Sequence, residues 1–285
     1  MKTFNYYFWA GLTFLMTGTY TQSQTVEVTK TWSTPELLTT CESVRYYEAE
    51  KALFVSCING SPLEKNGNGF ISKLSLSGDI ILLEWATGLD APKGMGILGE
   101  SLYVTDIDRV VKLSLETGQM EEEFFIPGSV FLNDIDVSDN GIVFISDFST
   151  DKIHAIENGN VILWYESTQL SGINGLFCEH DRLLAGTNQG IFAISYQDKK
   201  AEHLVKNTGG IDGLKADGHG NYIISDWAGK VQLVGPDKEN EILFNTTDQG
   251  INAADIEYIK NLNLLLVPTF NDNRVVAYDL MYKKN

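Results

Sequence analysis

Histidine, cysteine and positive charge are all scarce in this chain of 285 residues. It has 4 His, 3 Cys and 21 Lys and Arg against 38 Asp and Glu, which leaves a formal net charge of −17. Three scattered cysteines make no zinc site, and so acidic a chain is poorly suited to bind nucleic acid or anionic lipid. We therefore expect neither partner. The acidity is compatible with a cation site, although its simpler role is to keep the protein soluble.

Long apolar runs and helical periodicity are missing beyond the first residues of the chain. No stretch repeats its apolar residues every 3.6 positions, so long helices are not expected. At the N-terminus, Lys2 precedes a mostly apolar stretch from Phe4 to Met16, and Thr21 and Ser23 stand in a small-x-small relation. This pattern indicates a signal peptide over residues 1–23, and hence a secreted or periplasmic protein without a membrane partner once it is cleaved. The alternative is an uncleaved anchor, for which the apolar run is short.

The chain does have an internal repeat of about 40 residues. Each unit carries one polar residue at the start of a similar short motif, and successive spacings are 51, 40, 41, 38 and 40 residues. The six residues are Glu42 (C-E-S-V), Lys93 (P-K-G-M), Asn133 (L-N-D-I), Asn174 (I-N-G-L), Asp212 (I-D-G-L) and Asn252 (I-N-A-A). A period near 40 is typical of β-propeller blades. We predict an all-β, six-bladed β-propeller over residues 24–285, with the six polar residues in a ring at one mouth of its channel.

The fifth unit shows how each blade is divided into four strands. We predict strands at Gly213–Asp217, Tyr222–Ser225, Lys230–Val234 and Glu241–Phe244, separated by the turns D-G-H-G-N, A-G-K and G-P-D-K-E-N. Such clusters of Gly, Asn, Asp and Pro at short intervals are expected of an all-β chain. The sixth unit supplies only three strands. We therefore expect Thr25–Trp32 to complete that blade and close the ring.

Two further features should lie beside the ring. Asp106, Asp147 and Asp226 end second strands, where a carboxylate commonly caps a turn by accepting hydrogen bonds from backbone N–H groups, so we expect a structural role. The first unit also has a long connection, residues 58–69, on the same face. Long loops on a rigid scaffold often serve as lids or binding loops. The alternative is an insertion that the fold tolerates.

Cys41 and Cys57 flank a predicted hairpin turn at Glu48–Lys51, so we expect them to face each other across two strands. An oxidising compartment would allow a disulfide between them. Directly opposed strand positions are often poorly shaped for that bond, so the sequence leaves the pairing open. Cys178 lies in an apolar strand and is expected to be a core residue.

Oxygen donors dominate the predicted ring. Glu42 and Asp212 offer carboxylates, and the three asparagines, including Asn252 as an additional ring residue, offer amide oxygens. Hard cations such as Ca²⁺ prefer these donors. The absence of His and Cys from the ring disfavours zinc, copper and a Ser-His-Asp arrangement. A polar channel lined with water is the structural alternative.

These motifs resemble the gluconolactonase family of six-bladed propellers, which includes the senescence-marker (regucalcin) proteins and luciferin-regenerating enzymes. At the level of the repeat the resemblance covers residues 25–285. It implies that Glu42, Asn174 and Asp212 are ligands of a divalent cation, and that Asp212 is also the catalytic base. Asn133, in L-N-D, would then contact the substrate or the metal.

The sequence departs from that family at two positions. The family commonly places an arginine two residues before the N-D pair, where this chain has Phe131. Lys93 also enters the ring, where it would repel a cation. It would instead bind an anionic substrate or pair with Glu42. Both departures weigh against activity on a sugar lactone.

Three functions are compatible with these features. The first is a secreted, monomeric, Ca²⁺-dependent hydrolase of a lactone or ester, with Asn133 and Lys93 binding the small-molecule substrate. The second is a non-catalytic secreted propeller that binds a protein or glycan through the loops around the channel. The third is a redox propeller with a bound quinone, for which only Lys93 is a suitably placed basic residue. Whether the protein is an enzyme is left open by the sequence, because a fold does not imply a function.

Overall fold

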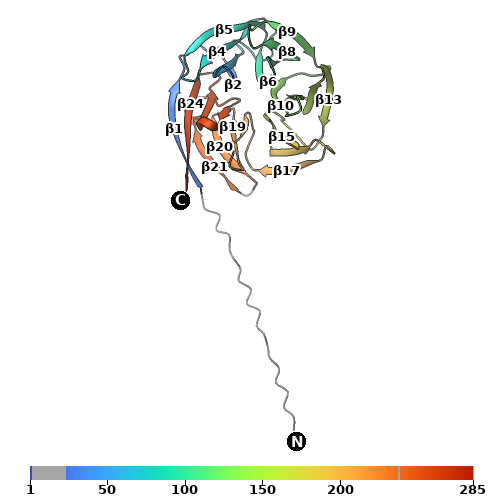
Figure 1. Ribbon diagram of the computed structural model, residues 1–285, viewed down its shortest axis with the longest axis vertical. Helices are drawn as coiled ribbons and strands as arrows, with labels where there is room; N and C mark the ends of the chain where they lie inside the picture. The colour runs from blue at the N-terminus through green and yellow to red at the C-terminus, as the bar shows by residue number, and fades with distance from the viewer. Residues whose placement is uncertain (2–23, 237, 285) are drawn as a thin grey trace.

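The protein is a ring of six antiparallel, four-stranded sheets around a central axis (Figure 1). This computed structural model describes residue 1, residues 24–236 and residues 238–284, so the predicted signal peptide lies almost wholly outside the described part. The first strands of neighbouring blades contact one another, which places them at the axis. The all-β, six-bladed propeller predicted from the repeat is therefore confirmed.

Five blades are built from consecutive strands. Blade 1 contains β2 (Cys41–Tyr47), β3 (Ala52–Cys57), β4 (Gly69–Ser75) and β5 (Ile80–Leu89), and blade 2 contains β6 (Pro92–Leu98), β7 (Ser101–Asp106), β8 (Arg109–Ser114) and β9 (Met120–Phe125). Blade 3 contains β10 (Leu132–Val137), β11 (Val143–Asp147), β12 (Lys152–Glu157) and β13 (Asn160–Glu166). Blade 4 contains β14 (Leu176–Cys178), β15 (Arg182–Thr187), β16 (Gly190–Ser195) and β17 (Ala201–Lys206), and blade 5 contains β18 (Leu214–Ala216), β19 (Tyr222–Asp226), β20 (Lys230–Gly235) and β21 (Lys238–Asn245).

The sixth blade joins the two ends of the chain. It contains β22 (Glu257–Ile259), β23 (Leu264–Pro268), β24 (Val275–Lys284) and, as its outermost strand, β1 (Gln24–Ser33). Figure 1 shows blue β1 running beside red β24, and the two pair antiparallel with Val28 opposite Leu280. The predicted closing strand is confirmed and is one residue longer at each end than Thr25–Trp32.

The fifth blade contains the four predicted strands, with different limits. β19, β20 and β21 extend beyond Tyr222–Ser225, Lys230–Val234 and Glu241–Phe244, so part of the predicted turn G-P-D-K-E-N belongs to β21. Its first strand was expected over Gly213–Asp217, but β18 is shorter at both ends. At one end, the N–H of Gly213 donates to Oγ of Ser225 (2.8 Å) instead of to a strand partner. At the other, Oδ1 of Asp217 accepts hydrogen bonds from the backbone of His219 and Asn221 and so begins a turn. The side chains at both ends therefore compete with the ladder for backbone groups.

The described residues contain only short 3₁₀ helices, Thr247–Gln249 and Lys260–Leu262, in addition to the strands. No helix among them is long and apolar enough to cross a membrane.

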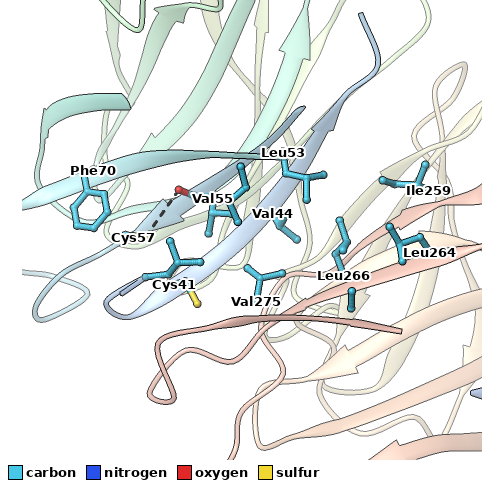
Figure 2. Close-up of a cluster of buried hydrophobic side chains, with 13 residues drawn as sticks. Cys41, Val44, Leu53, Val55, Cys57, Phe70, Ile259, Leu264, Leu266 and Val275 are labelled. Carbon is cyan, nitrogen blue, oxygen red and sulfur yellow. Dashed lines mark hydrogen bonds between the residues drawn. The ribbon is translucent and has the colours of Figure 1, made fainter. Parts of the chain in front are cut away.

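The apolar core lies between neighbouring blades. Figure 2 shows one such cluster, in which Val44 and Val55 of blade 1 face Leu266 and Val275 of blade 6. Strand residues alternate between the two faces of a sheet. Because each blade is covered on both faces, its inner strands are buried almost throughout, as in β3 and β7. Core packing therefore holds each blade against two others.

Cys41 and Cys57 are partners in the ladder between β2 and β3, as expected from the hairpin. Both are free thiols within the same apolar cluster (Figure 2). Sγ of Cys41 donates a hydrogen bond to the carbonyl of Arg274 (2.9 Å). Burial raises the pKa of the Cys41 thiol to about 12, which keeps it protonated and unreactive.

Removal of β1 should open the ring. Val26 and Val28 pack against the core between blades 5 and 6, and Trp32 packs against the core between blades 6 and 1. A chain that begins at residue 34 should therefore lose roughly 3 kcal/mol of stability and aggregate through the exposed edge of β24. Chemical denaturation and size-exclusion chromatography, with the chain that begins at residue 24 as control, would test this. Equal stability of the two chains would show that closure does not depend on β1.

Candidate functional site

Five of the six predicted ring residues line one cavity of about 430 Å³ at a mouth of the channel. They are Glu42, Lys93, Asn133, Asn174 and Asp212. Each comes from a different blade, at or just before the first strand. All are buried except Asn174, which is half-buried. The repeat thus brings side chains that lie about 40 residues apart in sequence into one site.

The glycine that follows a ring residue allows the first strands to approach so closely. A Cβ on Gly175 would lie 2.4 Å from the carbonyl oxygen of Asp212, and one on Gly213 would lie 2.4 Å from the backbone nitrogen of Ile256. Real Cβ atoms do not tolerate such contacts with backbone. The N-G and D-G pairs are therefore needed for packing at the axis, whatever the ring residue itself does.

Three side-chain oxygens of the cavity residues are buried without a hydrogen-bond partner. They are Oε2 of Glu42, Oδ1 of Asn133 and Oδ1 of Asn174. Nδ2 of Asn174 donates to Oδ1 of Asp212 (3.0 Å), which orients the amide so that its own oxygen stays free. Buried polar atoms are nearly always paired, and an unpaired one costs free energy. Three such oxygens in one cavity mark a place for a donor or a cation.

The charges of the cavity are shifted by burial. Burial, and then the nearby Asp212 and Asp255 carboxylates, hold the pKa of Glu42 well above its usual range. Burial and Asp255 raise the pKa of Asp212 to about 8. Burial lowers the pKa of Lys93 to about 8, although Glu42 and Asp106 oppose that shift. Without a ligand the cavity is therefore an environment that disfavours charge of either sign.

The two departures from the gluconolactonase pattern contact each other. Nζ of Lys93 lies 4.7 Å from the centroid of the Phe131 ring, within range of a cation–π interaction. The same ammonium donates a hydrogen bond to the carbonyl of Ala91 (2.9 Å). Phe131 thus stabilises the buried lysine, and these two residues form one unit in the cavity wall.

Asn252, the sixth ring residue, does not line the cavity. Its Nδ2 donates to the carbonyl of Trp227 (3.0 Å), and its Oδ1 accepts from Nδ2 of Asn271 (3.1 Å). Both ends of the amide are therefore used to hold neighbouring loops. The position has the structural role that an asparagine beside a turn usually has.

A second ring surrounds the first, and sequence reasoning missed it. In blades 1 to 5 it is the residue directly after the second strand, and in blade 6 it is the second residue after β23, which ends at Pro268. The six are Ile58, Ile107, Phe148, Asn188, Trp227 and Phe270. All but Ile107 line the cavity, and Ile107 packs in a small cluster with Ile58, Ala91 and Phe270. The signal was available, because the same alignment that locates Asp106, Asp147 and Asp226 also locates their neighbours.

The aspartates at the ends of the second strands do cap turns. Oδ1 of Asp106 accepts from the N–H of Ala91 (2.7 Å), and the two oxygens of Asp147 accept from Val130 and Phe131. Asp226 accepts from Ala228 (3.0 Å) and also lines the cavity. The expected structural role is confirmed.

The loop of residues 58–69 contributes to the cavity wall through Ile58 and Pro62. Lys65 pairs with Asp108 (2.6 Å), and the N–H of Gly67 donates to Oδ1 of Asp90 (3.0 Å). These contacts fasten the loop to blade 2.

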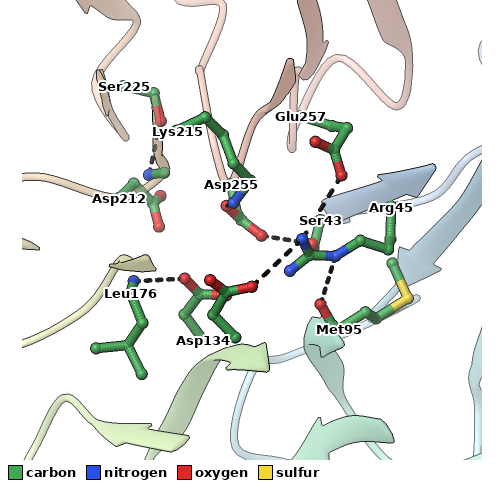
Figure 3. Close-up of polar contacts among 12 residues, drawn as sticks. Ser43, Arg45, Met95, Asp134, Leu176, Asp212, Lys215, Ser225, Asp255 and Glu257 are labelled. Carbon is green, nitrogen blue, oxygen red and sulfur yellow. Dashed lines mark hydrogen bonds and ion pairs between the residues drawn. The ribbon is translucent and has the colours of Figure 1, made fainter. Parts of the chain in front are cut away.

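Deeper in the channel, Arg45 ties four blades together (Figure 3). From blade 1 its guanidinium donates to the carbonyls of Met95 (2.7 Å) in blade 2 and Ile135 (3.0 Å) in blade 3. It also lies 3.6 Å from Glu257 of blade 6 and 3.7 Å from Asp136 of blade 3. Burial alone would lower the pKa of Arg45, but Glu257 and Asp136 outweigh it and raise that pKa.

Two further carboxylates complete this channel network. Asp134 accepts a hydrogen bond from the N–H of Leu176 in the next blade (2.7 Å), and Asp255 accepts one from Oγ of Ser43 (2.6 Å), as Figure 3 shows. Nζ of Lys215 lies 3.6 Å from Oδ1 of Asp255. The network therefore brings buried charges of both signs together at the inner strands and also bonds the backbone there.

The cavity residues fit a hard cation in donor chemistry. Within the part of the chain that the structure describes, no group of three or more His, Cys, Asp and Glu side chains is arranged to hold a metal. The predicted ligands are a different set, since they combine two carboxylates, Glu42 and Asp212, with the amide oxygen of Asn174. Two of these three residues carry unpartnered buried oxygens, which is what an oxygen-seeking cation requires. The metal stays a prediction.

Comparison with known proteins supports the fold. No protein-family model matches the chain, and no curated protein matches it. A gluconolactonase from Xanthomonas campestris is similar over 85% of this chain and 86% of its own, with 14% identity and a TM-score of 0.66. A virginiamycin B lyase from Staphylococcus aureus, crystallised with quinupristin as a catalytically inactive histidine-to-alanine variant, is similar over 90% and 100%, with 13% identity and a TM-score of 0.61.

A chain of a nidogen–laminin complex is similar over 72% of this chain and 80% of its own, with 17% identity and a TM-score of 0.57. At these identities the likeness shows the propeller fold alone, which in these neighbours serves a lactonase, a lyase and a protein complex.

Replacement of Arg45 should be strongly destabilising. Arg45→Ala leaves buried Glu257 and half-buried Asp136 without their cation and removes two hydrogen bonds to backbone carbonyls. We expect a loss of about 3–5 kcal/mol in the free energy of unfolding by chemical denaturation. Lys200→Ala, which removes an exposed ion pair with Asp198, is the control and should have a much smaller effect. A loss no larger than the control's would show that the channel network is dispensable.

Proposed function

We propose that this protein is a secreted hydrolase that acts on a lactone or ester with the help of a divalent cation, Ca²⁺. One observation carries the proposal. Three buried oxygens without partners, on Glu42, Asn133 and Asn174, belong to residues that line one cavity together with Asp212. A purely structural ring would be expected to pair these oxygens, as the loops pair both ends of Asn252.

The cation would be held by Glu42, Asn174 and Asp212. When bound, it supplies a Lewis acid for the carbonyl oxygen of the substrate. Its positive charge would also favour the ionised forms of Glu42 and Asp212, whose pKa values burial raises.

The reaction would then rely on three side chains of this protein. Asp212 accepts a proton from the water that attacks the carbonyl carbon. Asn133 and Lys93 bind the substrate, since both residues line the cavity. The C–O bond of the ester or ring breaks, and the alcohol oxygen takes up the proton. Hydrolysis needs no reactant other than water.

The neighbours in fold favour hydrolysis over the lyase reaction. The lyase neighbour is catalytically inactive when one histidine is replaced by alanine. The cavity described above is lined by no histidine, because the four histidines of this chain lie elsewhere.

Calcium should bind to the chelator-stripped chain of residues 24–285. Isothermal titration calorimetry should show one site, and Glu42→Gln should weaken binding at least tenfold because it removes an anionic donor. Glu48→Gln, an exposed turn residue, is the control and should bind like the unaltered protein. Absence of binding for Ca²⁺, Mg²⁺ and Mn²⁺ alike would show that Lys93 prevents a cation site.

Asp212→Asn should abolish turnover without loss of structure. The substitution keeps the size of the side chain and removes a carboxylate that burial disfavours, so stability should be equal or higher. We expect at least a thousandfold loss of kcat in an ester and lactone screen, with unchanged circular dichroism. Asp248→Asn, in the exposed 3₁₀ helix Thr247–Gln249, should leave kcat unaltered.

Retained turnover in Asp212→Asn would rule out its role as the base. If the unaltered protein hydrolyses nothing in the screen, the non-catalytic binding propeller becomes the better explanation.

A further inference from the structure

We infer, on the basis of the proposed function, that the substrate is an ester or lactone with an alkyl or aryl group, and not a polyhydroxylated sugar lactone. The inference rests on the second ring, whose members follow the second strands, and on Phe131.

Polar and apolar groups of the cavity are separated by depth. Glu42, Lys93, Asn133 and Asp212 are between 1% and 6% exposed, whereas Phe148 and Trp227 are 38% and 47% exposed. The groups suited to a reacting carbonyl are therefore deeply buried, whereas Phe148 and Trp227 lie nearer the entrance, which they share with the polar Asn188 and Asp226. A substrate that places its carbonyl among the ring residues has the rest of its structure against the aromatic wall.

The aromatic wall consists of two pairs. Phe131 and Phe148 meet edge to face with centroids 5.9 Å apart, and Trp227 and Phe270 do so at 5.4 Å. Together with Ile58 and Pro62 they form most of the upper lining. These side chains offer almost no hydrogen-bonding groups to sugar hydroxyls, which would lose their bonds to water on entry. They would instead bury an alkyl chain or an aromatic ring.

Backbone conformation at the entrance adds an independent observation. Ile107 and Phe270 have φ values of +63° and +47°, in the left-handed region that bulky and β-branched residues rarely adopt. Both belong to the small apolar cluster beneath the entrance, with Ile58 and Ala91. Such backbone persists only where the surrounding structure compensates for its cost. Here it places Phe270 in the cavity wall, where a glycine or asparagine at the turn would leave no apolar surface.

Large apolar side chains left exposed on a monomer often mark a binding surface. Phe148 and Trp227 are such residues. Leu63 and Val130, which neighbour wall residues in sequence, are 53% and 51% exposed. Exposed apolar side chains therefore flank the wall residues in the chain, as a substrate with a long apolar group would require.

The first test is the chain-length dependence of hydrolysis. In a series of p-nitrophenyl esters from acetate to octanoate, kcat/KM should rise roughly three- to fourfold for each methylene that enters the cavity. δ-Decalactone should be hydrolysed at least a hundredfold better than δ-gluconolactone. A flat series, or gluconolactone as the better substrate, would overturn the inference.

Variants should locate the preference in the wall. Phe131→Arg, which restores the arginine common in gluconolactonases, should reduce kcat/KM for the octanoate ester at least tenfold relative to the acetate ester. Trp227→Ala should do the same, while Phe131→Leu should retain most of the preference. Ile242→Ala, at an apolar position of β21 that is 57% exposed and outside the cavity lining, is the control and should change nothing. An equal loss of the octanoate preference in Ile242→Ala would show that the preference comes from non-specific hydrophobic binding to the surface and not from the wall.

A binding measurement separates failure of this inference from failure of the proposed function. Octanamide and gluconamide, which are poor substrates for ester hydrolysis, can be titrated by calorimetry into the chain of residues 24–285. Octanamide should bind and gluconamide should not. Phe131→Arg should weaken the binding of octanamide at least tenfold, even if no ester is hydrolysed. Preference for gluconamide would overturn the inference while leaving the hydrolase proposal standing.

Discussion

The inner edges of six sheets meet at one axis, and their backbone groups have to be bonded across the gap between blades. A first strand has a ladder partner on one side only, and an unpaired buried N–H or C=O is costly. Side chains therefore bridge the gap: Asp134 accepts from the backbone of Leu176, and Ser225 donates to the carbonyl of Ala254. Arg45 bridges to two other blades at once, because its guanidinium donates hydrogen bonds to backbone carbonyls in blades 2 and 3.

This requirement gives the two ends of the channel different characters. In the deeper part, Arg45 and Lys215 lie among the carboxylates and compensate their charge. At the mouth, Lys93 is the cation near Glu42, Asp212 accepts a hydrogen bond from Asn174, and Oε2 of Glu42 has no hydrogen-bond partner. Asp255 links the two ends, since its charge raises the pKa values of both Glu42 and Asp212. The network that completes the fold therefore also prepares the mouth for a positively charged or donating ligand.

Some features of this protein are required by any propeller, and others are particular to this one. The glycines after the ring residues and the capping aspartates follow from close strand approach and tight turns. The contact between Lys93 and Phe131 has no such structural necessity, since a smaller neutral residue would fit either position without a buried charge. Neighbours in fold with different activities show that the scaffold does not select the chemistry. The chemistry of this protein therefore has to be inferred from the residues around the cavity.

The sequence by itself determined the repeat, the number of blades, the closing strand and the register of the polar ring. Period, turn composition and strand alternation are local properties, and each of them is repeated six times. Only the tertiary structure decided which ring members share the cavity. Asn252 reads like Asn174 in sequence, yet its amide is consumed by Trp227 and Asn271, which lie 25 and 19 residues away in the chain. The pairing of Lys93 with Phe131, the burial of the free oxygens and the depth of the aromatic wall likewise depend on contacts between different blades. Hydrogen bonding and solvent exclusion across a closed ring are set by three-dimensional neighbours, and no local pattern encodes them.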